Sequence, residues 1–109
     1  MTIQVTGLPG NTPPAENIYI SGNFNNWDPG DPKYIMRPNS DSSVLEVSLP
    51  KGVGEIEYKF TRGDWSTVEK DPCGFEISNR VALYGKKLVI QDTIRSWNDL
   101  PKPGCPIVT

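Results

Sequence analysis

The sequence contains no histidine, so it lacks the commonest general base, proton shuttle and metal ligand of proteins. Its two cysteines, Cys73 and Cys105, are too few for a disulfide framework or a cysteine-only zinc site, and their spacing alone does not argue that they pair. No apolar run approaches the length of a membrane span. We therefore expect no metal, no cofactor and no contact with a membrane.

The chain also lacks a strong charge of either sign. With 11 basic and 13 acidic residues its formal net charge is -2, which does not indicate binding to nucleic acid. A length of 109 residues suffices for one domain with one core but not for a second core. The first six residues have a strand pattern rather than that of a signal peptide. The compartment is therefore open, and we expect a monomer.

Helix signals are nearly absent, because eleven prolines and ten glycines interrupt the chain every few residues. Strand signals recur instead, separated by turns roughly every eight to twelve residues. In the clearest one Ile56, Tyr58 and Phe60 alternate with Glu57 and Lys59, so Lys59 is expected to point outward. This pattern predicts an all-β fold, an antiparallel sandwich or barrel of about seven to eight short strands.

The remaining expected strands cover residues 3–8, 18–23, 34–37, 44–49, 81–84, 87–91 and 93–97. We expect residues 81–84 and 87–91 to form a hairpin around Gly85. After Leu100 the run Pro-Lys-Pro-Gly-Cys-Pro is typical of a linker or tail. Residues 1–100 are therefore assigned to the module and residues 101–109 to the tail.

The most unusual stretch is residues 18–31. It begins as an alternating strand and continues as a loop of glycine, asparagine, aspartate and proline, all of which are turn residues. Trp27 lies inside this polar loop. Its indole either folds back as a lid on the core or faces solvent to meet a ligand, and the functional interpretation depends on which is true.

A second tryptophan, Trp65, lies in another loop, and Asn79 follows it further along the chain. Two loop tryptophans, an outward lysine at position 59 and an asparagine are what a sugar-binding platform needs. One face of a pyranose ring consists of C–H bonds and stacks on an indole. The hydroxyls of the sugar then exchange hydrogen bonds with amides, carboxylates and ammonium groups at the rim.

The residues Ile-Tyr-Ile-Ser-Gly-Asn-Phe-Asn-Asn-Trp, then Val-Ser-Leu-Pro-Lys-Gly, Glu-Tyr-Lys-Phe-Thr-Arg, Val-Glu-Lys-Asp-Pro and Asn-Arg resemble the starch-binding domains of carbohydrate-binding module family 20. The related glycogen-binding modules of family 48 are similar. The resemblance extends from about Ile3 to Trp97. It implies an immunoglobulin-like β-sandwich that binds starch, glycogen or related α-glucans without catalysis, as part of a larger carbohydrate-active enzyme. It slightly favours an extracellular or periplasmic location.

By this resemblance Trp27 stacks on glucose, and Lys59, Glu69 and Asn79 add polar contacts. The second tryptophan of the family falls on Val68, directly before the glutamate. Trp65, three residues earlier than Val68, is our candidate to supply that indole from a shifted backbone.

The second site of the family uses three aromatic residues, of which only Tyr19 has a counterpart here. Another position falls near Val44, and the loop that would hold the third residue is shorter. We therefore expect this second site to be absent or weak.

Each candidate also has a purely structural interpretation. Trp27 would be a core lid, Trp65 would cap the end of a sheet, Lys59 would be a solvated strand residue and Asn79 a turn residue. Trp97, near the end of the chain, is expected to be structural. The alternative function is a structural or protein-interaction β-sandwich attached to a catalytic domain, with sugar binding lost. Val68 and the incomplete second site favour that alternative.

An acid pair for glycoside hydrolysis is the remaining possibility. Glu69 and Asp71 resemble one, since paired carboxylates hydrolyse glycosides. However, nothing in the sequence indicates a raised pKa for either, and the chain is too short for a deep substrate cleft. We therefore do not expect an enzyme.

Overall fold

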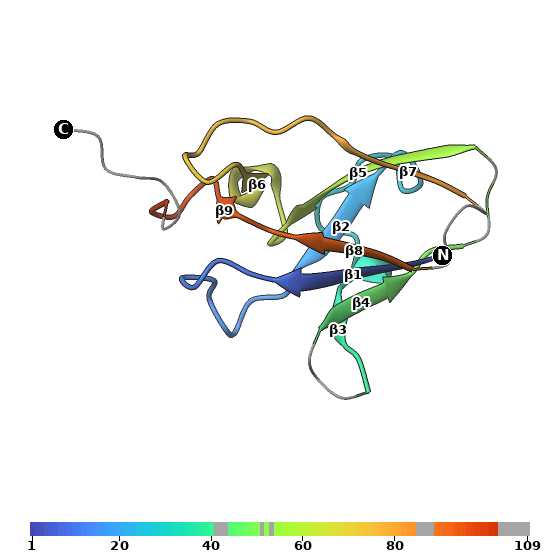
Figure 1. The fold of residues 1–109 in the computed structure, drawn as a ribbon, viewed down its shortest axis with the longest axis horizontal. Coiled ribbons are helices and arrows are strands. Elements are labelled where there is room, and N and C mark those ends of the chain that lie inside the picture. Colours follow the sequence, from blue (N-terminus) through green and yellow to red (C-terminus); the bar gives the residue numbers. More distant parts are fainter. Residues whose placement is uncertain (41–43, 51, 53, 85–88, 103–109) are drawn as a thin grey trace.

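A computed structural model describes residues 1–40, 44–50, 52, 54–84 and 89–102 of the chain. These residues form nine short strands and two 3-10 helices (Figure 1). The strands are β1 (Thr2–Gly7), β2 (Tyr19–Gly22), β3 (Arg37–Pro38), β4 (Leu45–Ser48), β5 (Glu55–Thr61), β6 (Glu69–Lys70), β7 (Arg80–Leu83), β8 (Val89–Thr93) and β9 (Ser96–Trp97), and the 3-10 helices are η1 (Pro32–Tyr34) and η2 (Trp65–Thr67). The predicted all-β class is confirmed.

The strands form a sandwich-like arrangement of sheets. One sheet has the order β3-β4-β1-β8 and another β2-β5-β7, while β6 and β9 form a small third sheet at one end (Figure 1). Among the described strands, β1 and β8 run parallel and the other pairs run antiparallel. The predicted antiparallel order therefore holds for every described pair but one.

The predicted hairpin of residues 81–84 and 87–91 is wrong. Strand β7 pairs with β5 and strand β8 pairs with β1, so the two neighbours in sequence belong to different sheets. Alternation predicts that a segment is a strand but not which strand it pairs with. A hairpin would require β8 to run antiparallel to β7, whereas β8 lies in the other sheet and runs parallel to β1. Gly85, the expected centre of the hairpin, lies outside the described residues.

The core lies between the two larger sheets. Its residues include most of those that the alternating pattern predicted to point inward. Its most buried side chains, each at most 2% exposed, are Ile3, Val5, Ile20, Ile56, Tyr58, Phe60, Ile94 and Trp97. Leu8 was the third residue expected on the face of Ile3 and Val5, but it is 41% exposed because β1 ends at Gly7. The predicted structural role of Trp97 agrees with its complete burial.

The segment expected as a strand at residues 34–37 begins instead as the end of η1. The carboxylate of Asp31 accepts a hydrogen bond from the backbone N–H of Lys33 at 3.0 Å, and Pro32 occupies the start of the helix. A side-chain cap and a proline at the first position both favour a helical turn. Strand β3 therefore starts only at Arg37.

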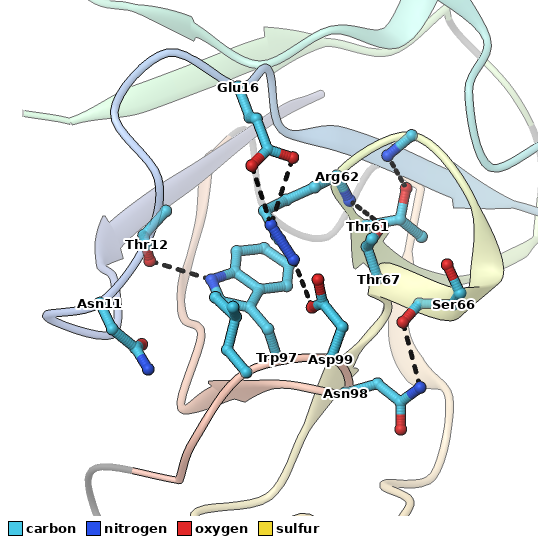
Figure 2. Close-up of polar contacts among 12 residues, drawn as sticks. Asn11, Thr12, Glu16, Thr61, Arg62, Ser66, Thr67, Trp97, Asn98 and Asp99 are labelled. Carbon is cyan, nitrogen blue, oxygen red and sulfur yellow. Dashed lines mark hydrogen bonds and ion pairs between the residues drawn. The ribbon is translucent and has the colours of Figure 1, made fainter.

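A buried arginine joins the segments at one end of the sandwich (Figure 2). The guanidinium of Arg62, whose side chain is 2% exposed, forms ion pairs with Glu16 and Asp99. It lies over the ring of Trp97, 5.2 Å from the centroid. Burial opposes the charged form of Arg62, but the hydrogen bonds that it donates to the carboxylates of Asp99 and Glu16 outweigh burial and raise its pKa. The backbone N–H of Arg62 donates to Thr67 Oγ1 at 3.0 Å, so this cluster also supports the loop that contains Trp65.

The end of the described chain remains attached to this cluster. Asn11 Nδ2 donates to the carbonyl of Pro101 at 2.9 Å, and Lys102 Nζ donates to the carbonyl of Trp97 at 2.7 Å. Residues 103–109 of the predicted tail, and Cys105 with them, lie outside the described residues. The part of the chain that the structure describes contains no helix long and apolar enough to cross a membrane.

Candidate functional site

The loop that follows β2 closes on its own backbone. The N–H of Trp27 donates to the carbonyl of Gly22 at 2.9 Å, and Asn25 Oδ1 accepts from the N–H of Gly22 at 3.0 Å. Asn26 and Trp27 have φ angles of 59° and 56°, in the left-handed region. That region costs a non-glycine residue about 1–2 kcal/mol. The loop therefore holds Trp27 in a strained backbone conformation, and such strain is often found at functional sites.

Phe24, rather than Trp27, covers the core from this loop. Phe24 packs against the buried cluster, and its ring meets that of Tyr34 edge-on at 4.9 Å between centroids. Among the described residues, Trp27 belongs neither to the core nor to the side chains packed against it. The core-lid interpretation therefore fits Phe24, and the half-buried indole of Trp27 faces other partners.

The main partner is Trp65, at the start of η2. The two indole rings lie 6.3 Å apart between centroids, with their planes tilted by 42°. Trp65 is 41% exposed. Val68, where the resemblance expects the second indole, is instead the residue that follows η2 and caps its end. The structure thus brings together the two loop tryptophans that the sequence singled out.

A capping box holds η2 in place. The carboxylate of Asp64 accepts from the backbone N–H of Ser66 at 2.8 Å and from its hydroxyl, and Thr67 Oγ1 lies within 3.5 Å of the Asp64 backbone N–H. Asn98 provides a second support, because its Nδ2 donates to the carbonyl of Ser66 at 3.1 Å (Figure 2). Trp65 is therefore displayed on a short but well-anchored turn.

Acid is expected to loosen this turn. The hydroxyl and the N–H of Ser66 hold the pKa of Asp64 below its usual value. Because the folded-state pKa is the lower one, the stabilisation is present above the ordinary aspartate pKa and is lost as pH falls through the folded value. We predict that the indole N–H signal of Trp65 in nuclear magnetic resonance spectra shifts with a midpoint below 3.8. Asp64→Ala should produce the shifted signal at neutral pH.

A matched control for this prediction is Glu55→Ala, which removes an exposed carboxylate from β5. That variant should leave the Trp65 signal and its acid titration unchanged. A Trp65 signal that does not respond to Asp64→Ala would show that the cap does not position the ring.

A surface cavity of about 500 Å³ lies on the outward face of the β2-β5-β7 sheet, and it is lined by Glu57, Lys59, Glu76, Ile77, Ser78 and Asn79. Strand pairing places Ser21 opposite Lys59, and the Trp27 loop begins one residue after Gly22, at the same end of β2. Lys59 lies on the side of β5 away from the core, as predicted, but is only 9% exposed. Its Nζ forms an ion pair with Glu76, whose Oε1 lies 3.6 Å away.

Asn79 lines the same cavity as Lys59, so the structure brings these two predicted residues together. Asn79 Nδ2 donates to Glu57 Oε1 at 3.3 Å. Ser21, on the same outward face, is completely buried, and within the described structure its Oγ has no hydrogen-bond partner. The cavity therefore offers both donors and acceptors close to the start of the Trp27 loop.

Glu69 does not lie at this surface. It is 1% exposed, and Oε2 accepts from the N–H of Phe60 at 2.9 Å. Both carboxylate oxygens also accept from Arg80, at 2.7 and 3.0 Å. The sequence-based assignment of Glu69 to the sugar-binding rim is therefore at odds with its position. Its carboxylate binds Arg80 inside the protein. Because Asn79 directly precedes Arg80, this ion pair also helps to fix the backbone at Asn79.

Arg80 connects Glu69 to a wider polar network between the sheets. Its NH1 donates to Asp92 at 3.3 Å, and Tyr58 donates its hydroxyl to the same carboxylate at 2.6 Å. Burial opposes the charge of Arg80, but Glu69 and Asp92 outweigh it and raise its pKa. Burial and the hydrogen bond to Asp92 raise the pKa of Tyr58 well above its ordinary value. The network is therefore a neutral tyrosine and an arginine held by two carboxylates.

Tyr19 lies on β2 with its ring near Gly63, in the loop that leads to Trp65. It pairs with Thr61 on the neighbouring strand and lines neither the Lys59 cavity nor an apolar groove of about 530 Å³ near Leu8. Val44, the other position of the expected second site, lines that groove. The structure therefore does not bring Tyr19 and Val44 into one cavity.

Glu57 and Glu76 are the charged cavity residues that the sequence-based prediction missed. A signal for Glu57 was available, because residues two apart on a strand point to the same face and Glu57 precedes Lys59 by two. Glu76 lies in an irregular segment without periodicity, so no local pattern indicated its approach to Lys59.

No protein-family model matches this chain. It is 36% identical over 94 residues to an alpha-amylase of Niallia circulans and 35% identical over 107 residues to an amylopullulanase of Thermoanaerobacter thermohydrosulfuricus, which cover 84% and 93% of the chain. A 1,4-alpha-glucan branching enzyme GlgB of Shewanella baltica is 30% identical over 91 residues, or 80% of the chain. The chain spans only 7%, 7% and 12% of the lengths of these three relatives. It is thus a small β-rich chain homologous to a short segment of each of these enzymes.

Proposed function

We propose that this chain is a non-catalytic carbohydrate-binding module of the family 20 type, which binds starch, glycogen or related α-glucans. The observation that carries the proposal is the pair of indoles of Trp27 and Trp65, 6.3 Å apart and outside the core. Each ring offers a flat apolar surface to the C–H face of a glucose residue. Lys59 and Asn79 provide the polar contacts from the adjoining cavity.

The tilt of the two rings supports an α-linked glucan. Planes that meet at 42° present their faces in different directions. A curved chain, such as an α-1,4-glucan, follows such a surface better than a flat ribbon such as cellulose. One open site of this size binds weakly, with a dissociation constant on the order of micromolar to millimolar, because few ligand atoms are buried. Repeated sites along a polymer raise the effective affinity.

The positions of the acidic residues support a module without catalysis. Glu69 is buried against Arg80. Asp71 uses its carboxylate to accept from the backbone N–H groups of Cys73 and Phe75, at 2.8 and 2.9 Å. Both members of the acid pair considered from the sequence are therefore occupied with structural hydrogen bonds.

The domain assignment is part of the same proposal. Residues 1–100 are the binding module, and residues 101–109 connect it within a larger carbohydrate-active enzyme. The comparisons support this arrangement, because the chain corresponds to only 5% to 12% of the length of its relatives. Pro101 and Lys102, the first two residues of this connection, contact the body of the module.

A fluorescence titration tests the proposal. Cyclomaltoheptaose, a soluble cyclic α-glucan, should give a saturable change in tryptophan emission with a dissociation constant of about 10 μM to 1 mM. Cello-oligosaccharides of matched length are the control and should give none. Equal responses to both sugars would contradict the α-glucan preference, and no response to either would contradict sugar binding.

A second candidate function is contact with another protein domain. Phe75, Val81 and Leu83 are 70%, 56% and 46% exposed, and Val81 and Leu83, two residues apart on β7, point to the same face. If the titration showed no sugar binding, this exposed apolar surface would favour a structural or protein-interaction module.

A further inference from the structure

The cavity on the outward face of the β2-β5-β7 sheet contains more negative than positive side chains. Glu57, Glu76 and Lys59 line it, so two carboxylates and one ammonium give a formal charge of -1. Lys59 is paired with Glu76 at 3.6 Å, and the amide of Asn79 donates to Glu57 at 3.3 Å. Both of the proposed sugar-binding donors therefore already have a carboxylate partner in the unliganded protein.

The segment that contains Glu76 is anchored at its start. The backbone N–H of Asp71 donates to the carbonyl of Phe75 at 2.9 Å, and the carboxylate of Asp71 accepts from two N–H groups of the same turn. Ser96 Oγ donates to the carbonyl of Asp71 at 2.6 Å, which ties the turn to β9. From there the segment runs along the molecule to β7 (Figure 1). Glu76 thus reaches Lys59 from a backbone that is fixed at one end by this turn and at the other by β7.

We infer that Glu76, together with Glu57, makes this site select uncharged glucans over glucans that contain phosphate esters. The inference rests on the proposed function and adds that the preferred glucan is uncharged. A hydroxyl both donates and accepts, so a neutral sugar satisfies the carboxylates and the ammonium group of Lys59 together. A phosphate dianion only accepts, so it competes with Glu76 for Lys59 and is repelled by both carboxylates.

The expected effect is moderate, because the site is open to water. The side chain of Glu76 is 77% exposed. Two unit charges about 4 Å apart in water interact strongly enough to change an affinity by roughly fivefold. The effect decreases with salt, because the Debye length falls from about 30 Å at 0.01 M to about 3 Å at 1 M. Glutamine has nearly the shape of the exposed Glu76 side chain and keeps an oxygen that can accept from Lys59, so Glu76→Gln should leave the fold intact.

The test uses the full chain and two ligands, maltoheptaose and a maltodextrin of matched length phosphorylated on most glucose residues. Isothermal titration calorimetry at low salt should show that the wild type binds the neutral ligand at least about fivefold more tightly. In Glu76→Gln this ratio should fall by about fivefold, since Lys59 loses its carboxylate partner. Glu55→Gln is the matched control, because Glu55 is an exposed glutamate of β5, the strand of Lys59, and does not line the cavity. It should keep the wild-type ratio.

Equal affinity of the wild type for both ligands would overturn the inference, and so would an unchanged ratio in Glu76→Gln. In either case binding of the neutral ligand would leave the proposed function standing. If the wild type bound neither ligand, the proposed function would be wrong and the inference would fall with it.

Discussion

Trp27→Gly weakens the binding of soluble α-glucans by about 30-fold, while the domain stays folded and is more stable than Trp27→Ala. The binding loss follows from removal of one of the two stacking rings, which should cost about 2 kcal/mol or roughly 30-fold in affinity. The gain in stability follows from the φ of 56° at this position, which glycine adopts freely. The free energy of unfolding should rise by about 1 kcal/mol relative to Trp27→Ala, which also loses binding but keeps the strained backbone.

Calorimetric titration and urea unfolding of the same samples measure both effects. Phe24→Ala is the matched control from the same loop. Because Phe24 packs against the core, its loss should reduce the free energy of unfolding by about 3 kcal/mol or more. A comparable destabilisation in Trp27→Ala would identify Trp27 as a lid on the core and contradict its role in stacking.

Glu69→Ala has the second large expected effect, and the effect is on folding. Removing this buried carboxylate leaves Arg80 partly buried without its closest partner and the N–H of Phe60 without its acceptor. Breaking a buried ion pair from one side costs about 3–5 kcal/mol. That is a large share of the roughly 5–15 kcal/mol by which a typical domain is stable. Urea unfolding at neutral pH should therefore show a much lower midpoint for this variant.

Glu76→Ala provides the comparison for Glu69→Ala, because it also removes a glutamate from an ion pair. Glu76 is largely exposed, so its loss should change the free energy of unfolding by no more than about 1 kcal/mol. If Glu69→Ala were as stable as the wild type and had lost only glucan binding, Glu69 would be a direct sugar contact, as the family resemblance first implied.

The strands could be predicted because burial repeats every second residue. Ile3, Val5, Ile56, Tyr58 and Phe60 alternate in the sequence, and all five are buried. Strand partners could not be predicted in the same way. The pairing of β8 with β1 depends on contacts between residues far apart in the chain, which alternation does not encode.

The candidate site could be predicted where residue type and loop composition sufficed. Trp27 and Trp65 were identifiable as large aromatic residues in polar loops. Their contact was not predictable from the strands, because β2 ends at Gly22, opposite Tyr58, whereas Trp65 follows the other end of β5, opposite Tyr19. The buried position of Glu69 could not be predicted, because it depends on the ion pair with Arg80, eleven residues away. Glu76 was missed for a similar reason, since an irregular segment brings it to Lys59.

The most direct test of sugar stacking follows the three indole N–H signals of the protein by nuclear magnetic resonance during a titration with cyclomaltoheptaose. The signals of Trp27 and Trp65 should move together and saturate along one binding curve. The signal of Trp97 should stay in place, because its ring is completely buried and its Nε1 donates to Thr12 at 2.9 Å. Signals of Trp27 and Trp65 that do not move at saturating sugar would contradict a glucan site built on this pair.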